Sequence, residues 1–514
     1  MGIDTTANNK RIAKNTIFLY FRMILVMGVN LYTSRIILNA LGISDFGIYS
    51  VVGGLVAMFS IISGSMSSAI SRFLTFELGH DDSLRLKKTF GISLTIQICL
   101  AIIIVLLCST AGAWFLHHKM DIPESSHKAA NWILAFSMLT LVVNLVSVPY
   151  NAIIIAHERM DIFAYVSLLE VTLKLGVAFM ILLFSSNRLI IYSCALFVVA
   201  IIIRMIYGLY CNRHFSECDT RPIFDRNLFK EMMGFAGWNF IGASSSVLRN
   251  QGNNVILNMF FSTAVNAAYG LTMQVNNAVT QLADNFMTSV NPQITKYYAQ
   301  SEFREMNKLM ERSSLLSFYL TLVISSIILL NTPFILHLWL KEVPPYTVSF
   351  VQLIMFFALI ESVSKPLITG MLATGKVRDY QIVVGGLQLL NLPLSYLALK
   401  LGATPLYPLI IAILVAVSCL IARLIMLKRI IPFDGVKFIL YVCFKALFVG
   451  TIVLGAPYIL KATLYTDKSF LRFVCESIIN IIWCCGVIFF LGCNRQEKKF
   501  ILSVVGRVSK KINR

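Results

Sequence analysis

The chain alternates between long apolar stretches and short polar segments from one end to the other. Each stretch holds roughly 20 residues or more, which is the length that an α-helix needs to cross a bilayer. Hydropathy is continuous within the stretches and does not alternate residue by residue, so helices are expected rather than barrel strands. The pattern predicts 14 transmembrane helices, over residues 15–40, 48–74, 89–115, 129–155, 162–184, 189–211, 232–261, 264–290, 313–336, 347–372, 380–399, 406–427, 438–460 and 470–493.

Composition leaves no room for a soluble domain. Hydrophobic residues make up 57% of the 514 residues and charged residues only 13%. A soluble surface needs roughly a quarter to a third of charged residues, so most of this chain must be shielded from water. The sequence therefore predicts an all-α integral membrane protein with short connecting segments.

Basic residues are distributed unequally between the two sides of the predicted membrane. If the N-terminus is cytoplasmic, the cytoplasmic segments carry 27 Lys and Arg, the external loops carry 7, and the helices carry 10. Cytoplasmic loops of membrane proteins collect Lys and Arg, so this bias accounts for the net charge of +19 without a nucleic-acid partner. Both termini are therefore expected in the cytoplasm.

The sequence also repeats internally. Arg35-Ile-Ile-Leu-Asn39 aligns with Asn254-Val-Ile-Leu-Asn258, and Ser147-Val-Pro149 aligns with Ser364-Lys-Pro366, at shifts of 219 and 217. Arg204 aligns with Arg423 at the first of these shifts. We predict two six-helix lobes in a parallel pseudo-twofold repeat, the arrangement of transporters whose substrate lies at the lobe interface. The expected parts are a first lobe over 1–211, a linker over 212–231, a second lobe over 232–429, two added helices over 430–493 and a basic tail over 494–514.

Charged residues within a membrane suggest function unless a structural role explains them. Arg72, Arg204, Arg423, Lys445 and Arg472 lie near helix ends, so we expect their head groups to reach the interface by snorkelling. Two pairs four residues apart, Glu170 with Lys174 and Glu361 with Lys365, are expected to neutralise each other on one helix face.

Neither snorkelling nor an ion pair along the same helix explains Arg249 and Arg35. Arg249 lies near the middle of its predicted helix, within a run of Ser, Asn and Gln that lipid would not tolerate. A guanidinium group binds phosphate through paired, charge-assisted bonds, and amides suit sugar hydroxyls, although polar contacts between helices are the alternative. The candidate substrate-binding residues are Arg35, Arg249, Arg72, Lys174, Asn250, Asn254, Gln274 and Asn277.

Two further groups of residues are candidates for movement and coupling. Pro149 and Pro366 lie within predicted helices at matched repeat positions, so they are expected to kink or unwind those helices at a gate. Asp284 and Glu361 are the second-lobe carboxylates placed to bind a coupling ion. No catalytic residue, metal site or cofactor is expected, because the cysteines lie mostly in apolar stretches and the histidines are scattered.

Several motifs resemble those of one transporter family. They are Arg35-Ile-Ile-Leu-Asn-Ala-Leu-Gly-Ile-Ser-Asp-Phe-Gly-Ile-Tyr49, Pro149-Tyr-Asn-Ala-Ile-Ile-Ile-Ala-His-Glu-Arg-Met160, Phe235-Ala-Gly-Trp238, Asn291-Pro-Gln-Ile294 and Leu338-Trp-Leu340 with Pro344. The chain resembles the O-antigen-type polysaccharide flippases of the multidrug/oligosaccharidyl-lipid/polysaccharide exporter superfamily. The resemblance implies two lobes that alternate between inward-open and outward-open forms. It also implies export of an undecaprenyl-pyrophosphate-linked oligosaccharide from the cytoplasmic to the periplasmic leaflet of a bacterial inner membrane, for surface polysaccharide, O-antigen or capsule synthesis.

Three other functions stay open. A lipid II flippase also carries an anionic polyprenyl glycolipid, while a cation-coupled drug antiporter needs membrane carboxylates that this first lobe largely lacks. A membrane-embedded glycosyltransferase or acyltransferase needs paired carboxylates or a His/Asp site, usually on a larger loop. The expected partners are the lipid-linked oligosaccharide, the bilayer and the polymerase or glycosyltransferases of the same pathway, and the protein is expected to be a monomer.

Overall fold

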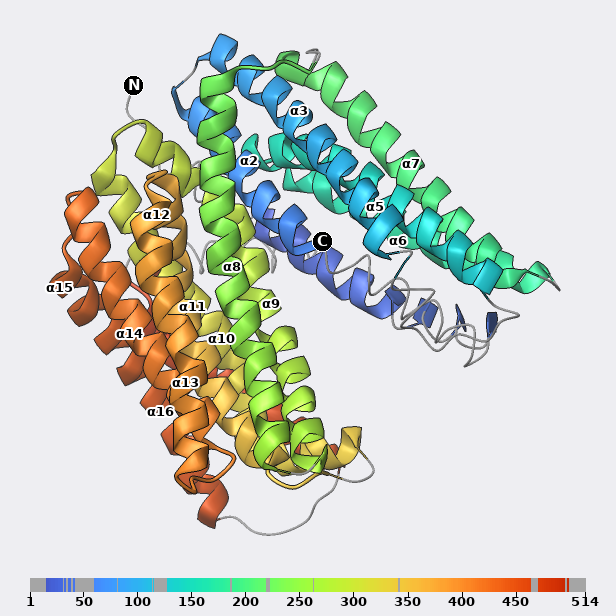
Figure 1. Cartoon of the computed structure of the whole chain (residues 1–514). Helices are drawn as coiled ribbons and strands as arrows, with labels where there is room; N and C mark the ends of the chain where they lie inside the picture. Colours follow the sequence, from blue (N-terminus) through green and yellow to red (C-terminus); the bar gives the residue numbers. More distant parts are fainter. Residues whose placement is uncertain are drawn as a thin grey trace, which may run out of the picture. The chain divides into compact units, whose positions relative to one another are not determined.

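The computed structural model is made of helices, as Figure 1 shows. It describes residues 15–30, 32–33, 36–37, 40–41, 60–80, 82–112, 114, 127–184, 187–218, 222–261, 263–340, 343–463, 470–494 and 497–498. These residues contain no strand, and their helices form 14 segments. The predicted all-α membrane fold is therefore confirmed.

By packing, the chain divides into two compact units. Unit 1 comprises residues 1–244, 288–302 and 375–378, and unit 2 comprises residues 245–287, 303–374 and 379–514. These units are defined by contacts between residues, whereas the predicted lobes are defined by the sequence repeat. The predicted lobe boundaries therefore stay a prediction.

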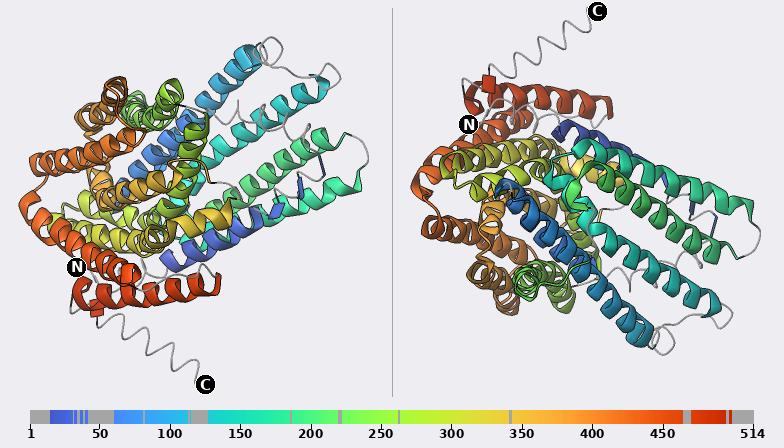
Figure 2. Two further views of the ribbon diagram at one scale, coloured as in Figure 1. Left: turned by 90° about the horizontal axis from the view of Figure 1, so that it is seen from below. Right: turned by 90° about the horizontal axis from the view of Figure 1, so that it is seen from above.

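Unit 1 is built around α5. This helix (His127–Ala156) packs against α2 (Ser60–His80), α3 (Ser83–Leu107) and α7 (Arg188–His214), and α6 (Met160–Met180) packs against α7. The buried side of α5 is apolar and includes small residues that allow close helix approach. The two views of Figure 2 show these helices running alongside one another.

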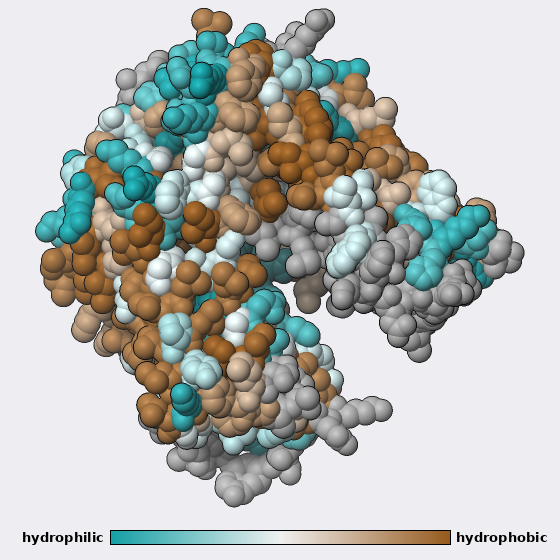
Figure 3. All heavy atoms as spheres, viewed as in Figure 1, coloured by the Kyte–Doolittle hydropathy of each residue, from teal (hydrophilic) through white to brown (hydrophobic). Residues whose placement is uncertain are grey.

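Unit 2 is built around α11 (Thr347–Ala373), which packs against α10 (Phe303–Trp339) and α14 (Tyr407–Ile430). The other helices surround this centre. They are α13 (Gly386–Lys400), α15 (Gly435–Phe438), α16 (Phe444–Thr463) and α17 (Phe470–Val487). The short α12 (Val377–Tyr380) begins in unit 1 and ends in unit 2, and it joins α13 through a π-helical turn, as α15 joins α16. Exposed apolar side chains gather over unit 2 (Figure 3), as expected for a surface that faces lipid.

Two long helices contribute to both units. The first part of α8 (Arg226–Phe260) belongs to unit 1 up to Ser244, and the last part of α9 (Thr263–Ala299) belongs to unit 1 from Thr288. The remainder of each helix belongs to unit 2 and joins its apolar core through residues such as Leu257 and Tyr269.

Helix ends differ from the predicted ends where a helix continues beyond its apolar stretch. The predictions ended one helix at residue 290 and began the next at 313, whereas α9 ends at Ala299 and α10 begins at Phe303. Ten described helices are long and apolar enough to cross a membrane, and neither α8 nor α9 is among them. Their Ser, Asn and Gln content lowers the mean hydropathy, so they need protein or water around them.

Candidate functional site

Arg249 is a buried positive charge in unit 2. It lies on α8 with only 9% of its surface exposed. Its Nε donates to Oδ1 of Asn250 at 3.3 Å, and its Cζ lies 4.9 Å from the ring centroid of Phe357 on α11. Among the described residues, no carboxylate lies within ion-pair distance of Arg249. The surroundings therefore hold the guanidinium group in place without neutralising its charge.

One face of α11 contacts three other helices. Phe357, Glu361 and Lys365 follow one another at intervals of four residues, so they share this face. Phe357 lies under Arg249, and Oε1 of Glu361 lies 4.0 Å from Nη1 of Arg423 on α14. Lys365 donates to Oδ1 of Asp284 on α9. The charged residues of α8, α9 and α14 are thus brought together along a single helix, α11.

Glu361 and Lys365 do not pair with each other as predicted. Each pairs with a residue of another helix, which side-chain spacing along one helix cannot reveal. The equivalent prediction for α6 is confirmed, because Nζ of Lys174 lies 2.6 Å from Oε1 of Glu170.

The prediction that Arg423 snorkels to the interface is wrong. Arg423 is 1% exposed, and its Nε donates to the hydroxyl of Tyr380 at 3.3 Å. Glu361 supplies the nearby negative charge that a buried guanidinium group requires. The sequence shows only that Arg423 lies near the end of its helix. It does not show that residues of other helices, Tyr380 and Glu361, surround the side chain there.

The amide-rich part of α8 carries unsatisfied polar atoms. Asn254 is half-buried, and its Oδ1 is shielded from solvent without a hydrogen-bond partner among the described residues. Gln388 of α13 accepts a bond from Ser246 at 2.7 Å, so part of this run serves helix packing instead. The packing role of the amide-rich run is therefore observed at Ser246, and binding of sugar by Asn250 and Asn254 stays a prediction.

A polar stripe runs along α9. Gln274, Asn277, Gln281 and Asp284 are all exposed, and their spacing of three, four and three residues places them on one face. At a rise of about 1.5 Å per residue the stripe is about 15 Å long. Helical spacing from Gln274 would have identified Gln281, which the predicted site omits.

Arg72, a candidate of unit 1, is surrounded by aromatic rings. Its Cζ lies 4.6 Å from the ring centroid of Phe73, 4.7 Å from that of Phe76 and 5.7 Å from that of Phe235 on α8. These contacts stabilise a cation by the negative faces of the rings. Arg35, the remaining candidate arginine, lies outside the described residues.

The two candidate gate prolines occupy matched positions. Pro149 and Pro366 are buried in α5 and α11, and each lies seven residues before the last residue of its helix. Neither helix is unwound at its proline. In each case the second residue after the helix has a positive φ, +58° at Glu158 and +74° at Gly375. The local sequence repeat is therefore also a repeat of local structure.

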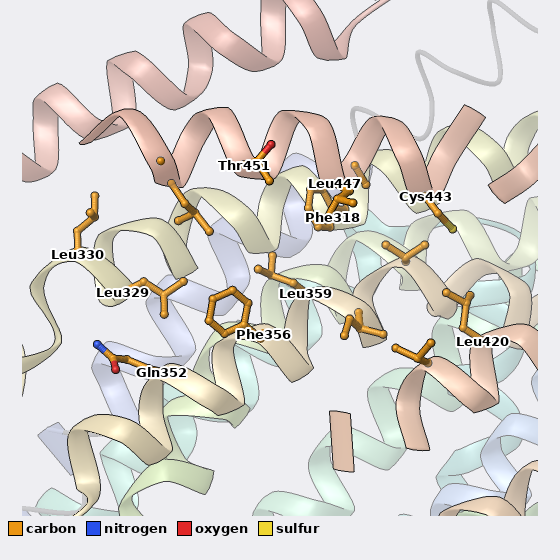
Figure 4. A pocket seen from close by; sticks show the side chains of 17 residues that line it. Phe318, Leu329, Leu330, Gln352, Phe356, Leu359, Leu420, Cys443, Leu447 and Thr451 are labelled. Carbon is orange, nitrogen blue, oxygen red and sulfur yellow. The ribbon is translucent and has the colours of Figure 1, made fainter. Parts of the chain in front are cut away.

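A separate cavity of about 830 Å³ lies among α10, α11, α14 and α16. Figure 4 shows that the labelled side chains around it are mostly apolar, with Gln352 and Thr451 as the polar exceptions. Its volume is within the range of small-molecule sites, about 300–1,000 Å³. The lining suits hydrocarbon and not sugar or pyrophosphate, so this cavity is not the predicted polar site.

Comparisons with known families agree with the membrane fold. A family model described as polysaccharide biosynthesis protein matches residues 12–298, which is more than half of the chain. A second model, MatE, matches residues 248–397. A search of curated proteins found no match.

Solved transporters share the fold at low sequence identity. One is described as the outward-facing conformation of a multidrug resistance MATE family transporter of the MOP superfamily. It has a TM-score of 0.72 and 10% identity, over 82% of this chain and 96% of that chain. Another is a MOP superfamily transporter from Pyrococcus furiosus, for which reverse polarity of the binding pocket is described as suggesting a different function. It has a TM-score of 0.69 and 10% identity over the same shares. A third, the MATE transporter ClbM in complex with Rb⁺, has a TM-score of 0.67 and 12% identity, over 83% and 96% of the two chains.

Proposed function

Because the chain belongs to the polysaccharide biosynthesis protein family, we propose that this MOP-superfamily transporter is a flippase for lipid-linked oligosaccharide. Its cargo would be an oligosaccharide on undecaprenyl pyrophosphate, moved from the cytoplasmic to the periplasmic leaflet of the bacterial inner membrane by alternating access. Both termini would be cytoplasmic. The product would serve surface polysaccharide, O-antigen or capsule synthesis.

The unneutralised charge of Arg249 carries this proposal. Two of the described arginines are less than a tenth exposed. Arg423 faces a carboxylate, whereas Arg249 faces an amide and an aromatic ring. Burying an unpaired charge is costly, so such a residue is retained where an opposite charge arrives. A pyrophosphate supplies that charge, and the guanidinium group can bind it through two parallel bonds.

The neighbouring amides suit the sugar part of the cargo. Asn250 and Asn254 lie on α8 beside Arg249, and Gln274 and Asn277 lie on the exposed stripe of α9. A side-chain amide both donates and accepts hydrogen bonds, as sugar hydroxyls do. Arg72, Lys174 and Arg35 are proposed as further basic contacts along the path.

Asp284 and Glu361 are the proposed sites of ion coupling. Each already has a basic partner, Lys365 and Arg423 respectively. A coupling ion would therefore have to replace that partner, so binding would change contacts among α9, α11 and α14. Pro149 and Pro366 are proposed to bend α5 and α11 during the same cycle.

A conditional deletion of the gene tests the proposed cargo. Polyprenyl-linked sugars should accumulate on the cytoplasmic side after depletion, and lipid extraction with mass spectrometry would identify them. Purified protein in vesicles should then move that lipid across the bilayer. Normal surface polysaccharide without accumulation would refute the proposal.

Cation-coupled drug export is the second candidate, favoured by the MatE match over residues 248–397. It predicts that cells lacking the protein become sensitive to cationic compounds and keep normal lipid-linked sugars. Accumulation of lipid II upon depletion would indicate the lipid II flippase activity instead. Transferase activity would appear as turnover of a sugar or acyl donor by the purified chain.

A further inference from the structure

The turn between α5 and α6 has an unusual residue at its centre. Glu158 has φ of +58°, in the left-handed region that favours glycine. The N–H groups of Glu158 and Arg159 bond to the carbonyl oxygens of Ile155 and Ile154, at 2.9 and 3.0 Å. This is the way a helix ends when glycine follows it, so a glutamate here requires stabilising contacts elsewhere.

Those contacts join the turn to two other helices. The side chain of Glu158 is 1% exposed, and its Oε1 accepts a bond of 2.9 Å from Nζ of Lys296, which is 19% exposed. The carbonyl oxygen of Glu158 accepts a bond of 2.9 Å from Nδ2 of Asn15. One residue later, the hydroxyl of Thr16 lies 2.9 Å from that of Ser289. The helix Asn15–Asn30, the α5–α6 turn and the end of α9 are therefore held together.

The end of α9 is also packed closely against α2. The rings of Phe76 and Tyr298 lie 6.3 Å apart, and a Cβ placed on Gly79 would lie 2.6 Å from Cβ of Ala299. Only glycine permits this approach. The last turns of α9 are thus fixed within unit 1, whereas residues 263–287 of the same helix belong to unit 2. The end of α9 can leave unit 1 only if these contacts break.

The repeat offers an internal comparison. At the shift of 217 residues, Glu158 corresponds to Gly375, which follows α11 and has φ of +74°. Gly375 also lies against a basic residue of unit 1, since a Cβ there would be 2.7 Å from Nη2 of Arg72. The turn at Gly375 leaves room for Arg72 because glycine has no side chain. The first turn instead uses an ion pair, which can be broken and remade.

We infer that Glu158 and Lys296 form a clasp that holds the end of α9 within unit 1 and opens once in each transport cycle. Asn15 holds the turn in the conformation that presents the carboxylate to Lys296. When the end of α9 moves away, water reaches both charges and replaces the ion pair. The inference rests on the proposed function only in requiring alternating access, and it is independent of the cargo.

Hydrogen–deuterium exchange of the full chain in lipid nanodiscs tests the clasp directly. Glu158→Gln and Lys296→Met should each raise amide exchange in residues 288–302 several-fold. The double variant Glu158→Lys/Lys296→Glu should restore protection, because it reverses the pair. Arg159→Gln is the matched control, since it removes an exposed ion pair with Asp161 from the same turn and should leave residues 288–302 protected.

A second variant separates charge from backbone strain. Glu158→Asn removes the charge but keeps a residue that tolerates positive φ. It should raise exchange in residues 288–302 as Glu158→Gln does. Wild-type protection in Glu158→Asn would overturn the inference, because backbone conformation and not the ion pair would then hold α9.

Transport completes the test. Export of surface polysaccharide should fall severalfold in Glu158→Gln and Lys296→Met and recover in the reversed pair. Increased exchange with unchanged export would overturn the clasp as a gate and leave the proposed cargo intact. If depletion of the protein causes no accumulation of lipid-linked sugars, the proposed function fails, but the exchange results still decide whether the clasp exists.

Discussion

Lys365 pairs with Asp284 of α9 although Glu361 lies one turn away on its own helix. The Lys365 side chain is 19% exposed, and that of Asp284 is 58% exposed, so the carboxylate is accessible from outside the packed core. An exposed carboxylate that is held by a more buried ammonium can exchange this partner for an incoming cation. The pair therefore connects the two helices that carry the proposed cargo and coupling sites.

If Asp284 binds the coupling ion, Asp284→Asn should abolish ion-dependent transport, and adding Lys365→Met should not restore it. Vesicle transport measured with and without an ion gradient checks this expectation. If the double variant transports normally, the pair only neutralises charge, and Asp284 is not a coupling site. Arg472→Met/Glu476→Gln removes an ion pair on α17, outside both predicted lobes, and serves as the control.

Arg249→Ala should reach the membrane at normal levels but fail to export polysaccharide. A hydrogen bond to a charged group contributes about 1.5–3 kcal/mol, and about 1.4 kcal/mol corresponds to tenfold. We therefore expect a loss of at least about tenfold in export. Arg249→Lys should restore export only in part, because an ammonium group cannot form two parallel bonds.

Controls for Arg249 come from other basic residues. Lys445→Ala should be nearly neutral, because Lys445 lies on α16 against the ring of Tyr441 and outside both predicted lobes. Arg35→Ala should impair export more mildly than Arg249→Ala. Normal export by Arg249→Ala would make the arginine structural, and Lys174 and Arg72 would become the next candidates.

Pro149→Ala and Pro366→Ala should slow transport and leave membrane insertion intact, because each restores a backbone N–H that stiffens the helix. Initial rates of export at matched protein levels measure the effect. Pro457→Ala in α16 is the matched control, since this proline lies outside both predicted lobes. Unchanged rates in both single variants and in their double variant would remove the prolines from the gate.

A single cysteine in place of Arg514, in a variant without the native cysteines, should react with a thiol reagent only after the cells are permeabilised. The 27-to-7 distribution of basic residues is the reason for this expectation. A cysteine in place of His118, in a predicted external loop, should react in intact cells. The reverse pattern would contradict the predicted topology.

The hydrogen bond between His157 and Glu217 predicts a local dependence on pH. Burial raises the pKa of Glu217, but hydrogen bonds from the His157 ring, at 2.5 Å, and from its own backbone and Ser216 outweigh that effect, so the pKa is lowered overall. The ionised carboxylate therefore stabilises the fold above the ordinary glutamate pKa, and this contribution is lost as pH falls through the lowered value. Amide exchange of residues 214–218 should rise below about pH 4, the usual glutamate range. Glu217→Gln should be nearly insensitive to pH over this range.

Hydropathy was sufficient to predict the all-helical fold, because lipid requires each crossing segment to satisfy its own backbone. It was insufficient for the ends of α9 and α10, where polar residues continue the helix beyond the apolar stretch. It also misplaced Arg423, whose burial depends on Tyr380 and Glu361 from other helices. For the candidate site, the residue types in the sequence were sufficient to indicate Arg249. Only the packing of the helices shows which charged residues already have a partner.

The polarity of α8 also has a consequence for biogenesis. An arginine at the centre of a membrane helix opposes insertion by about 3 kcal/mol, and α8 adds Ser, Asn and Gln to Arg249. Its later partners α11 and α14, which complete the core around it, are synthesised more than 80 residues afterwards. Until then, α8 must be retained by the translocon or by helices already inserted. The stable insertion of α8, the helix that carries Arg249, therefore depends on helices that are synthesised after it.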